Sequence, residues 1–186
     1  QFERMARDVQ ASAPYPVPRH ILNTNGVLRF PEAQYEMVRL GIGFYGVDRT
    51  GLLETTLATP AHLTTQISQI KQLRPGATVG YGRKGQIRES TTIATLAIGY
   101  ADGFSRLLSN GRGYVTIHGY KAPVIGDVCM DMTMVDITGI PAREGDQVTV
   151  FGQDPTVEEM ARLSETIPYE ILTSISQRVK RVYYQE

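Results

Sequence analysis

The chain has 186 residues, which is enough to bury a core of its own, and its 19 lysines and arginines balance its 19 aspartates and glutamates. This balance does not point to nucleic acid or an anionic membrane as a partner, and no apolar run approaches the ~18 residues of a membrane-spanning helix. Cys129 is the only cysteine, so no disulfide can form within the chain, which fits a reducing compartment such as the cytoplasm.

The first residues carry a helical pattern. Phe2, Met5, Ala6 and Val9 follow at i, i+3, i+4 and i+7, the spacing of an apolar stripe along one face of a helix. Because this pattern is already under way at Gln1, without an initiator methionine, we expect the chain to be part of a longer protein.

Two short apolar segments follow a proline-rich loop over residues 13–18. Residues 19–24 predict a buried strand that runs into a polar loop over residues 23–26, and residues 37–47 predict a second buried strand. A short helical turn is expected between them, over residues 31–38. A helix followed by two such strands is typical of an α/β fold.

The character of the sequence changes after Asp48, and we place a domain boundary near residue 50, between segments 1–50 and 51–186. The second segment holds short apolar runs separated by Pro-Gly, Asp-Gly, Asn-Gly and Glu-Gly-Asp turn signals, a spacing that favours a β-barrel or sandwich. The predicted fold class is therefore mainly β. The strands are expected over residues 63–70, 93–98, 113–117, 123–124, 128–135, 147–151 and 181–184.

Two helices are expected among these strands. Thr156 and Glu159 have the spacing of a capping box, and the apolar face of the helix that follows would be Val157, Met160 and Ala161. A second helix should begin at Pro168, a favoured first-turn residue, and should bury Ile171, Leu172 and Ile175.

Tyr81 stands between two glycines and is followed by two cations, Arg83 and Lys84. The glycines allow a tight turn that leaves the phenol clear of its neighbours. Nearby positive charge stabilises a phenolate and lowers the phenol pKa, which must fall by roughly 2–3 units from ~10 for a base that works near neutrality. The alternative interpretation is a hairpin turn that carries a surface tyrosine.

Polar groups also follow the two expected strands of the first segment, where α/β barrels place their sites. Thr24 offers a hydroxyl, and the backbone amides of Gly41 and Ile42 could approach a phosphate. Arg39 lies in an otherwise apolar strand and needs a partner there, which could equally be solvent or a structural carboxylate. His20 is either a ligand or a core histidine, and no group of residues has the spacing of a metal site.

Several separate motifs occur in order along nearly the whole chain. The first segment holds residues 20–31 and 37–46, and the second holds Val79-Gly80-Tyr81-Gly82, Ile98-Gly99-Tyr100-Ala101-Asp102-Gly103, Val128-Cys129-Met130-Asp131, Ile167-Pro168-Tyr169-Glu170 and Arg178-Val179-Lys180-Arg181-Val182. Together these motifs resemble the alanine racemases, and residues 20–46 are similar to the last two barrel strands of that family.

The resemblance implies an N-terminal (β/α)8 TIM barrel that holds pyridoxal 5′-phosphate, followed by a C-terminal β-barrel-like domain. Residues 1–50 would be the last helix-strand-strand portion of the barrel, and residues 51–186 would be the C-terminal domain. The family also implies a head-to-tail homodimer, in which each β-domain closes the partner's active site. Its reaction interconverts L- and D-alanine for peptidoglycan synthesis in the cell wall.

The resemblance also implies roles for single residues. Tyr81 would be the catalytic base that acts on one face of the substrate, in the partner's site. Arg39 would face the pyridine nitrogen of the cofactor, and His20 would be hydrogen-bonded to this arginine. The phosphate-binding positions are Thr24 (where serine is usual), Gly41, Ile42 and Tyr169.

Other positions concern the substrate. Met130 matches a residue near the substrate carboxylate, with its backbone amide as the donor. Residues that resemble the access corridor are Tyr100, Arg106, Asp131 and Tyr169. Asp127 stands where some members of the family carry arginine, so we do not carry over that corridor contact.

The main departure from the family is the absence of its Schiff-base lysine, which lies on the first barrel strand. The lysines at positions 71, 84, 121 and 180 lie in no such motif, so this polypeptide alone is expected to be inactive. The longer protein could be a plain racemase or a fusion with a cell-wall ligase. Two alternatives stay open, which are a racemase for serine and a non-catalytic β-barrel binding module.

Overall fold

The computed structural model describes residues 1–184 and falls into two compact units, Gln1–Pro60 and Ala61–Glu186. The boundary that the sequence suggests near residue 50 lies inside the first unit. None of the helices in the described residues is long and apolar enough to cross a lipid bilayer.

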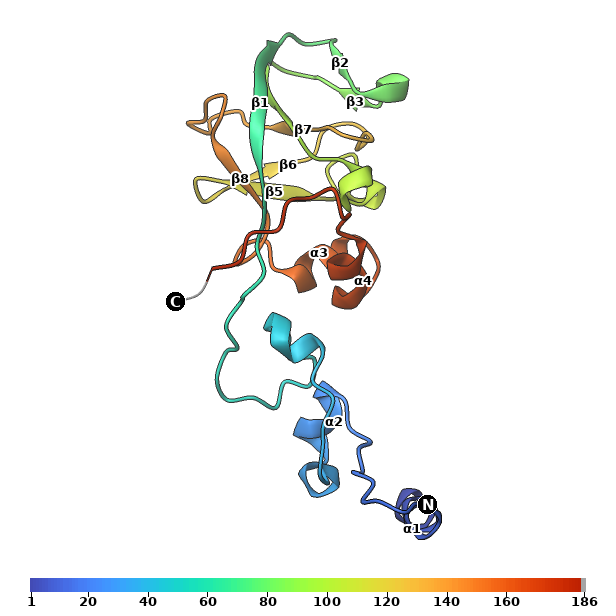
Figure 1. Ribbon diagram of the computed structural model, residues 1–186. Coiled ribbons are helices and arrows are strands. Elements are labelled where there is room, and N and C mark those ends of the chain that lie inside the picture. The colour runs from blue at the N-terminus through green and yellow to red at the C-terminus, as the bar shows by residue number, and fades with distance from the viewer. Residues whose placement is uncertain (185–186) are drawn as a thin grey trace. The chain divides into compact units, whose positions relative to one another are not determined.

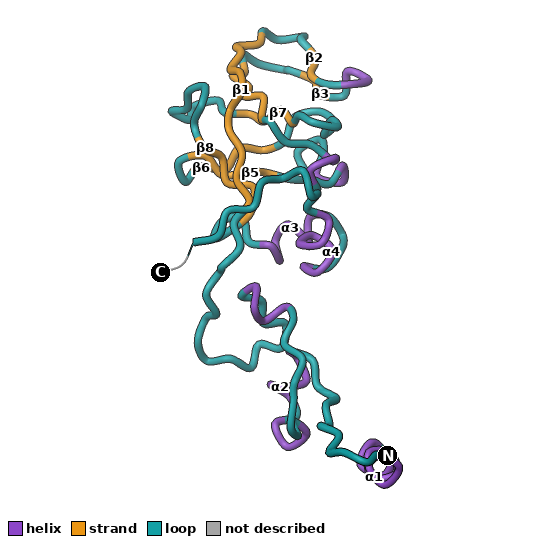
Figure 2. Tube along the Cα trace, in the orientation of Figure 1, coloured by secondary structure: helices purple, strands orange, loops and turns teal. Residues whose placement is uncertain are grey.

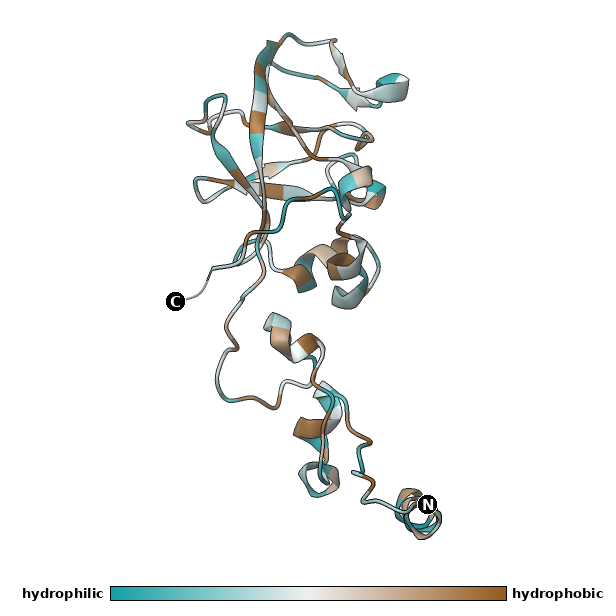
Figure 3. Cartoon of the chain, viewed as in Figure 1, coloured by the Kyte–Doolittle hydropathy of each residue, from teal (hydrophilic) through white to brown (hydrophobic). Residues whose placement is uncertain are grey.

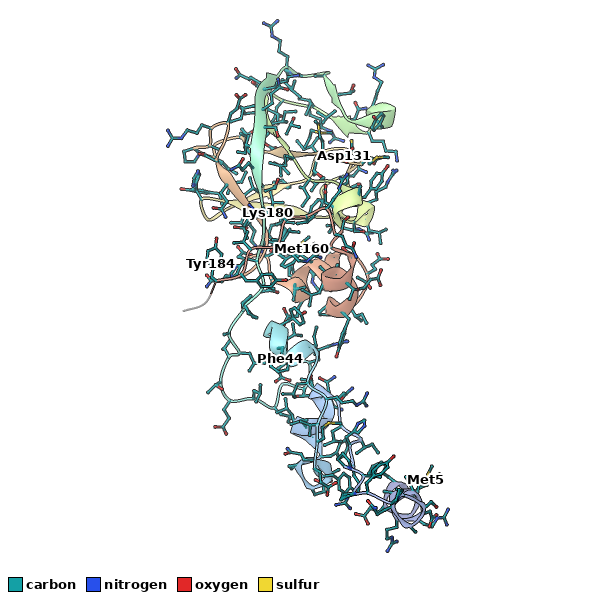
Figure 4. The ribbon with its side chains drawn as sticks, in the orientation of Figure 1. Met5, Phe44, Asp131, Met160, Lys180 and Tyr184 are labelled. Atoms are coloured by element: carbon teal, nitrogen blue, oxygen red, sulfur yellow. The ribbon has the colours of Figure 1, made fainter. Side chains whose placement is uncertain are left out.

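The first unit consists of short helices joined by loops (Figure 2). The expected N-terminal helix is α1 (Phe2–Ser12), whose apolar stripe is not buried within the unit. The side chain of Met5, for example, extends from α1 into solvent (Figure 4). The other helices of the unit are α2 (Thr24–Arg29), the 3-10 turn η1 (Pro31–Ala33), which confirms the expected helical turn, and the 3-10 turn η2 (Ile42–Tyr45).

The two buried strands expected in this unit do not form, so that prediction was wrong. Only one parallel bridge, between Asn23 and Arg39, joins the two segments within the described chain, and the Arg39 amide donates to the Leu22 carbonyl (3.0 Å). A strand is stable only when neighbours pair along its length, and here each segment has a single residue of pairing. Thr24 already begins a helix at that point, and the apolar side chains of Ile21 and Met37 are exposed.

The second unit is built on a six-stranded antiparallel sheet with the order β6-β5-β8-β1-β4-β7 (Figure 1). A bridge between Val124 and Val135 joins the chain at the two edge strands, so the sheet closes into a barrel-like ring and confirms the mainly β fold class. The strands are β1 (Leu63–Leu73), β4 (Thr91–Leu96), β5 (Tyr114–Ile117), β6 (Tyr120–Pro123), β7 (Thr133–Asp136) and β8 (Gln147–Phe151), with a separate hairpin of β2 (Thr78–Val79) and β3 (Gly85–Gln86).

The long strand β1 connects the two halves of this ring. Residues 63–66 pair with β8, residues 67–73 pair with β4, and the register shifts between Ile67 and Gln69. A register shift of this kind bends a strand and lets a sheet curl. Hydrophobic positions therefore alternate toward one interior (Figure 3), where the buried side chains include Ile67, Leu96, Val115, Ile117, Val135 and Val148.

Two helices follow the last strand of the sheet. Helix α3 (Val157–Leu163) begins as expected, because the Thr156 hydroxyl accepts a hydrogen bond from the Glu159 amide (3.1 Å), and Met160 on its apolar face is buried (Figure 4). Helix α4 (Pro168–Ser174) begins at the expected proline. It buries Ile171, whereas Leu172 and Ile175 are only half-buried, which corrects the prediction.

Three expected strands of this unit differ from the prediction, and the β2–β3 hairpin was not predicted. The strand expected over residues 123–124 is β6 (Tyr120–Pro123), which begins earlier and overlaps the expected range only at Pro123. No strand forms over residues 181–184, whose side chains are exposed. The strand expected over residues 128–135 begins only at Thr133. The carbonyls of Cys129 and Met130 accept from residues 100 and 101 instead of from a neighbouring strand, so this stretch is a loop.

Candidate active site

Three loops of the second unit meet around Cys129. The amides of Tyr100 and Ala101 donate to the carbonyls of Cys129 and Met130, both at 3.0 Å. The backbone amide of Tyr81 interacts with the Cys129 sulfur, and burial raises the pKa of this thiol. The unit thereby brings together the loops that carry Tyr81, Tyr100 and Met130, and that these residues share one site stays a prediction.

A glycine makes this close approach possible. A Cβ atom on Gly99 would lie 2.3 Å from the carbonyl oxygens of both Cys129 and Met130, so a larger residue would separate the two loops. The sequence motif around Gly99 therefore has a physical basis in the contact between the loops.

Tyr81 stands on the turn that connects β2 and β3, in the 3-10 turn η3 (Tyr81–Arg83). Gly80 has φ 75 and ψ −179, a conformation that is essentially restricted to glycine. The tyrosine is 77% exposed, so the phenol stands clear of its neighbours, as the flanking glycines predict. The loop is also a hairpin turn with a surface tyrosine, so its geometry agrees with both interpretations of the sequence.

The two cations after Tyr81 have partners of their own. The Arg83 guanidinium donates to the Thr78 hydroxyl (3.2 Å), and the Lys84 ammonium pairs with the Asp127 carboxylate (2.9 Å). The sequence predicted that these charges act on the phenol, but it did not predict either of these contacts.

Asp127 is a buried carboxylate that the sequence analysis left out of the site. Besides Lys84, it accepts hydrogen bonds from Arg106 (3.2 Å) and from the Asn110 side chain (2.8 Å). The Lys84 ammonium, the Asn110 amide and the Arg106 guanidinium together hold the pKa of Asp127 below its usual range. An aspartate inside the apolar run Val124-Ile125-Gly126-Asp127-Val128 was the signal that could have revealed it.

Arg178 is a second residue whose role in the site the sequence did not reveal. Its guanidinium donates to Asp102 (2.7 Å) and to Asp131 (2.5 Å). Both carboxylates raise the pKa of the arginine, and Asp102 has the larger effect. Asp102 also accepts from the Gly99 amide (2.9 Å), which makes it the turn residue expected there. Asp131, labelled in Figure 4, is thereby fixed beside the loop that carries Tyr100.

Tyr169 lies in the first turn of α4, directly after Pro168, and its side chain is partly exposed. It therefore belongs to the second unit, whereas Thr24, Gly41 and Ile42, the other predicted phosphate-binding positions, belong to the first.

In the first unit, Thr24 and the backbone at residues 41–43 are in contact. The buried Thr24 hydroxyl accepts from the amides of Gly41 (3.0 Å) and Gly43 (3.4 Å). A Cβ atom on Gly43 would lie 2.7 Å from the Thr24 methyl group, so only glycine fits there. The Thr24 hydroxyl keeps its own proton, which it can donate to an anion, whereas the amides of Gly41 and Gly43 already donate to Thr24 and the Gly26 amide donates to Asn23 (3.0 Å).

Arg39 and His20 lie close to this corner in the sequence, and both are exposed. The Arg39 guanidinium donates to the Ile21 carbonyl (3.5 Å), and residues 1–184 contain no hydrogen bond between His20 and Arg39. The exposure of Arg39 agrees with the alternative in which its partner is solvent, since the strand expected around it does not form. No three histidine, cysteine, aspartate or glutamate side chains of the described residues group into a metal site.

Comparison with known proteins gives two family matches. The model described as "Alanine racemase, N-terminal domain" matches residues 1–49, and the model described as "Alanine racemase, C-terminal domain" matches residues 61–183. Together these matches argue against the free-standing binding module considered from the sequence.

Individual relatives agree with these matches. The chain is 42% identical to alanine racemase 1 of Clostridium acetobutylicum over 89% of this chain and 45% of the relative. It is 36% identical to the alanine racemase of Desulfosudis oleivorans over 98% of this chain and 49% of the relative. The chain thus spans about half the length of the curated relatives it matches.

Solved structures give the same result. The alanine racemase of Clostridium difficile 630 matches with a TM-score of 0.89 and 36% identity, over 98% of this chain and 48% of that one. The alanine racemase of Bartonella henselae, solved with covalently bound pyridoxal phosphate, matches with a TM-score of 0.85 and 36% identity, over 96% of this chain and 50% of that one.

Proposed function

The chain belongs to the alanine racemase family, and from this premise we propose that it is the C-terminal part of a longer pyridoxal-phosphate-dependent racemase that interconverts L- and D-alanine. The observation that carries the proposal is the position of Tyr81, an exposed phenol on a glycine-flanked turn, beside the loops that hold Tyr100 and Met130. We propose alanine rather than serine as the substrate, because the relatives are named as alanine racemases.

The residues of the first unit fit the phosphate of this cofactor. The Thr24 hydroxyl and the Ile42 amide would hold the phosphate, while the neighbouring Gly41 amide donates to Thr24. By resemblance, Tyr169 is a further phosphate-binding position. Arg39 would bind the ring nitrogen, with His20 beside it. A guanidinium donates a hydrogen bond and keeps its proton, so that nitrogen would stay unprotonated. When bound, the cofactor withdraws electrons from the substrate and makes its α-hydrogen acidic.

Racemisation requires that a proton leaves one face of the substrate α-carbon and returns to the other face. Two bases on opposite faces do this most simply, and Tyr81 would be one of them. The other would be a lysine in the rest of the longer protein. The Met130 amide and Tyr100 would orient the substrate carboxylate, and the corridor to the site would pass Arg106 and Asp131.

We also propose a head-to-tail homodimer in the cytoplasm. A tyrosine that projects from the β-domain, remote from the phosphate-binding corner in sequence, suits a site that is completed by a partner subunit. Each active site would then take its phosphate-binding residues and its tyrosine from different subunits.

The test is Tyr81→Phe in the full-length holoenzyme. The substitution keeps the ring and removes its only titratable group, so racemisation should fall by ~10²–10⁴-fold, the usual contribution of a positioned acid or base. Exchange of the α-hydrogen with deuterated solvent should persist for D-alanine, because by resemblance its α-hydrogen faces the lysine. The same exchange should nearly vanish for L-alanine.

Tyr120→Phe is the matched control, since Tyr120 is another exposed tyrosine of the same unit, on β6. It should leave both rates unchanged. Equal residual exchange of the two enantiomers in Tyr81→Phe, or near-normal turnover, would reject Tyr81 as the base and would leave it a tyrosine on a surface turn.

A further inference from the structure

The hairpin that carries Tyr81 has few contacts of its own. Strands β2 and β3 pair through only two residue pairs, Thr78 with Gln86 and Val79 with Gly85. A hairpin this short is not stable by itself, because each pair contributes little. The base of the hairpin is also held by the Ile87 amide, which donates to the Ala77 carbonyl (3.0 Å), and by packing of Val79 and Ile87 against Ile93. The turn at its tip, on which Tyr81 stands, depends on further contacts.

Asp127 is placed to provide such contacts. The residue is 6% exposed, and its carboxylate contacts the Lys84 ammonium at the end of the tyrosine turn (2.9 Å). The same carboxylate is held by Arg106 (3.2 Å) and Asn110 (2.8 Å), which lie on a different loop. One buried charge thus ties the tyrosine turn to residues that are fixed in the body of the unit.

The backbone around Asp127 lies close to the other end of the turn. A Cβ atom on Gly80 would lie 3.5 Å from the Asp127 amide nitrogen, and a Cβ atom on Gly126 would lie 2.8 Å from the Val79 carbonyl oxygen. The turn that carries Tyr81 is therefore held at its start by backbone contact and at its end by the Lys84–Asp127 ion pair.

We propose that Asp127 is a positioning residue for Tyr81, and that it acts through Lys84. The proposal rests on the function proposed above, in which Tyr81 is a base. Asp127 itself does not touch substrate. It holds the turn in the orientation from which the phenol reaches the α-carbon, and Lys84 serves as a tether rather than as a free charge beside the phenol.

Lys84→Met is the most selective variant, because it removes the tether and leaves Asp127 with its two other partners. In the full-length holoenzyme, kcat for racemisation should fall in both directions on the order of 10- to 100-fold, the effect of a displaced catalytic group, because Tyr81 would remove the proton in one direction and return it in the other. KM should change little, and exchange of the α-hydrogen of D-alanine should persist. Asp127→Asn should have the same effect on kcat.

Arg83→Met is the matched control, since it removes a positive charge from the same turn without a contact to Asp127. It should lower kcat by less than Lys84→Met does, whereas a similar loss in both variants would mean that charge, and not position, matters. A second control is the Tyr81→Phe background. Lys84→Met should have no further effect on the residual exchange there, and a further loss would show a general structural role and overturn the proposal.

A fluorine resonance of 3-fluorotyrosine at position 81, assigned by its absence in Tyr81→Phe, reports the position of the ring without activity. Lys84→Met and Asp127→Asn should shift or broaden it alike, and Arg83→Met should not. If the wild type racemises and this resonance is unchanged in Lys84→Met, the positioning role is wrong and the proposed function stands. If the wild type does not racemise alanine, the proposed function fails, and the resonance alone decides whether the ion pair holds Tyr81.

Discussion

The two units of the chain differ in how they bury apolar side chains. In residues 1–60 the buried hydrophobic residues are Leu22, Ile42 and Val47, whereas most of the buried hydrophobic residues lie in the second unit. Hydrophobic residues recur along the strands of that unit (Figure 3). Every strand of its sheet finds its hydrogen-bonding partners within the unit. The first unit has one bridge, between Asn23 and Arg39, and leaves the stripe of α1 exposed.

This difference extends to the way that each unit contributes to the proposed site. The first unit offers one hydroxyl and backbone amides, which local turns can position without a large core. The second unit offers side chains, Tyr81 above all, whose position depends on contacts between distant loops. We therefore expect substitutions in the core of the second unit to have much larger effects than comparable substitutions in the first.

The largest effect is expected for Phe104→Ala. Phe104 is 1% exposed, and truncation of a buried phenylalanine typically costs ~3–5 kcal/mol of unfolding free energy through lost burial and a residual cavity. Phe44, in η2 of the first unit, is 69% exposed, so Phe44→Ala should change the stability by less than ~0.5 kcal/mol.

Denaturant unfolding of the 186-residue chain, followed by far-ultraviolet circular dichroism, measures both values. A loss of more than ~2 kcal/mol for Phe44→Ala would be typical of a large core truncation and would show that the first unit has a core of its own. A loss below ~1 kcal/mol for Phe104→Ala would contradict the structure of the second unit.

The sequence predicts the second unit better than the first, for a physical reason. Alternating apolar residues between strong turn signals specify strands such as β1, β4 and β8, whose partners lie within the unit. The same kind of apolar run over residues 19–24 gives no strand, because pairing depends on neighbours and not on the run itself. No strand forms over residues 128–132 for a related reason, because the carbonyls of Cys129 and Met130 accept hydrogen bonds from another loop.

The candidate site could be predicted where the signal is local. Glycines on both sides of Tyr81 indicate an exposed phenol, and the structure has one. The partners of Asp127 and Arg178 could not be predicted, because each ion pair joins residues that lie far apart along the chain. The roles of Arg39 and His20 toward a cofactor stay predictions.

A smaller effect is expected at the helix caps, where both units use the same device. The Thr156 hydroxyl accepts from the Glu159 amide (3.1 Å), and the Asn23 side chain accepts from the Gly26 amide (3.0 Å). Removal of such a cap typically costs ~1 kcal/mol. Thr156→Ala should show this loss in global unfolding, because α3 packs on α4 and buries Met160. Asn23→Ala should show less, because α2 buries only Thr24 within its own short length. Equal losses would mean that both helices unfold together with the core.

The smallest effect on stability is expected for an ion pair of the first unit. Arg19 donates to Glu36 through its side chain and its backbone amide, and these hydrogen bonds lower the pKa of Glu36 to about 2. A carboxyl whose folded pKa lies below its unfolded value of ~4.3 stabilises the fold above that pH, and the contribution is lost as the pH falls from about 4 to about 2.

Both side chains are exposed, so Arg19→Met should barely change global unfolding at pH 7. The change appears instead in a carboxyl titration by nuclear magnetic resonance, where Arg19→Met should raise the pKa of Glu36 toward ~4.3 but not fully to it, because the backbone amide of residue 19 still donates to the carboxylate. The buried Asp127 provides the contrast, because its low pKa depends on Lys84 and should rise in Lys84→Met while Glu36 stays unchanged. A Glu36 that titrates near ~4.3 in the unaltered chain would show that the ion pair does not persist in solution, and that the first unit is held by even less than its few buried residues indicate.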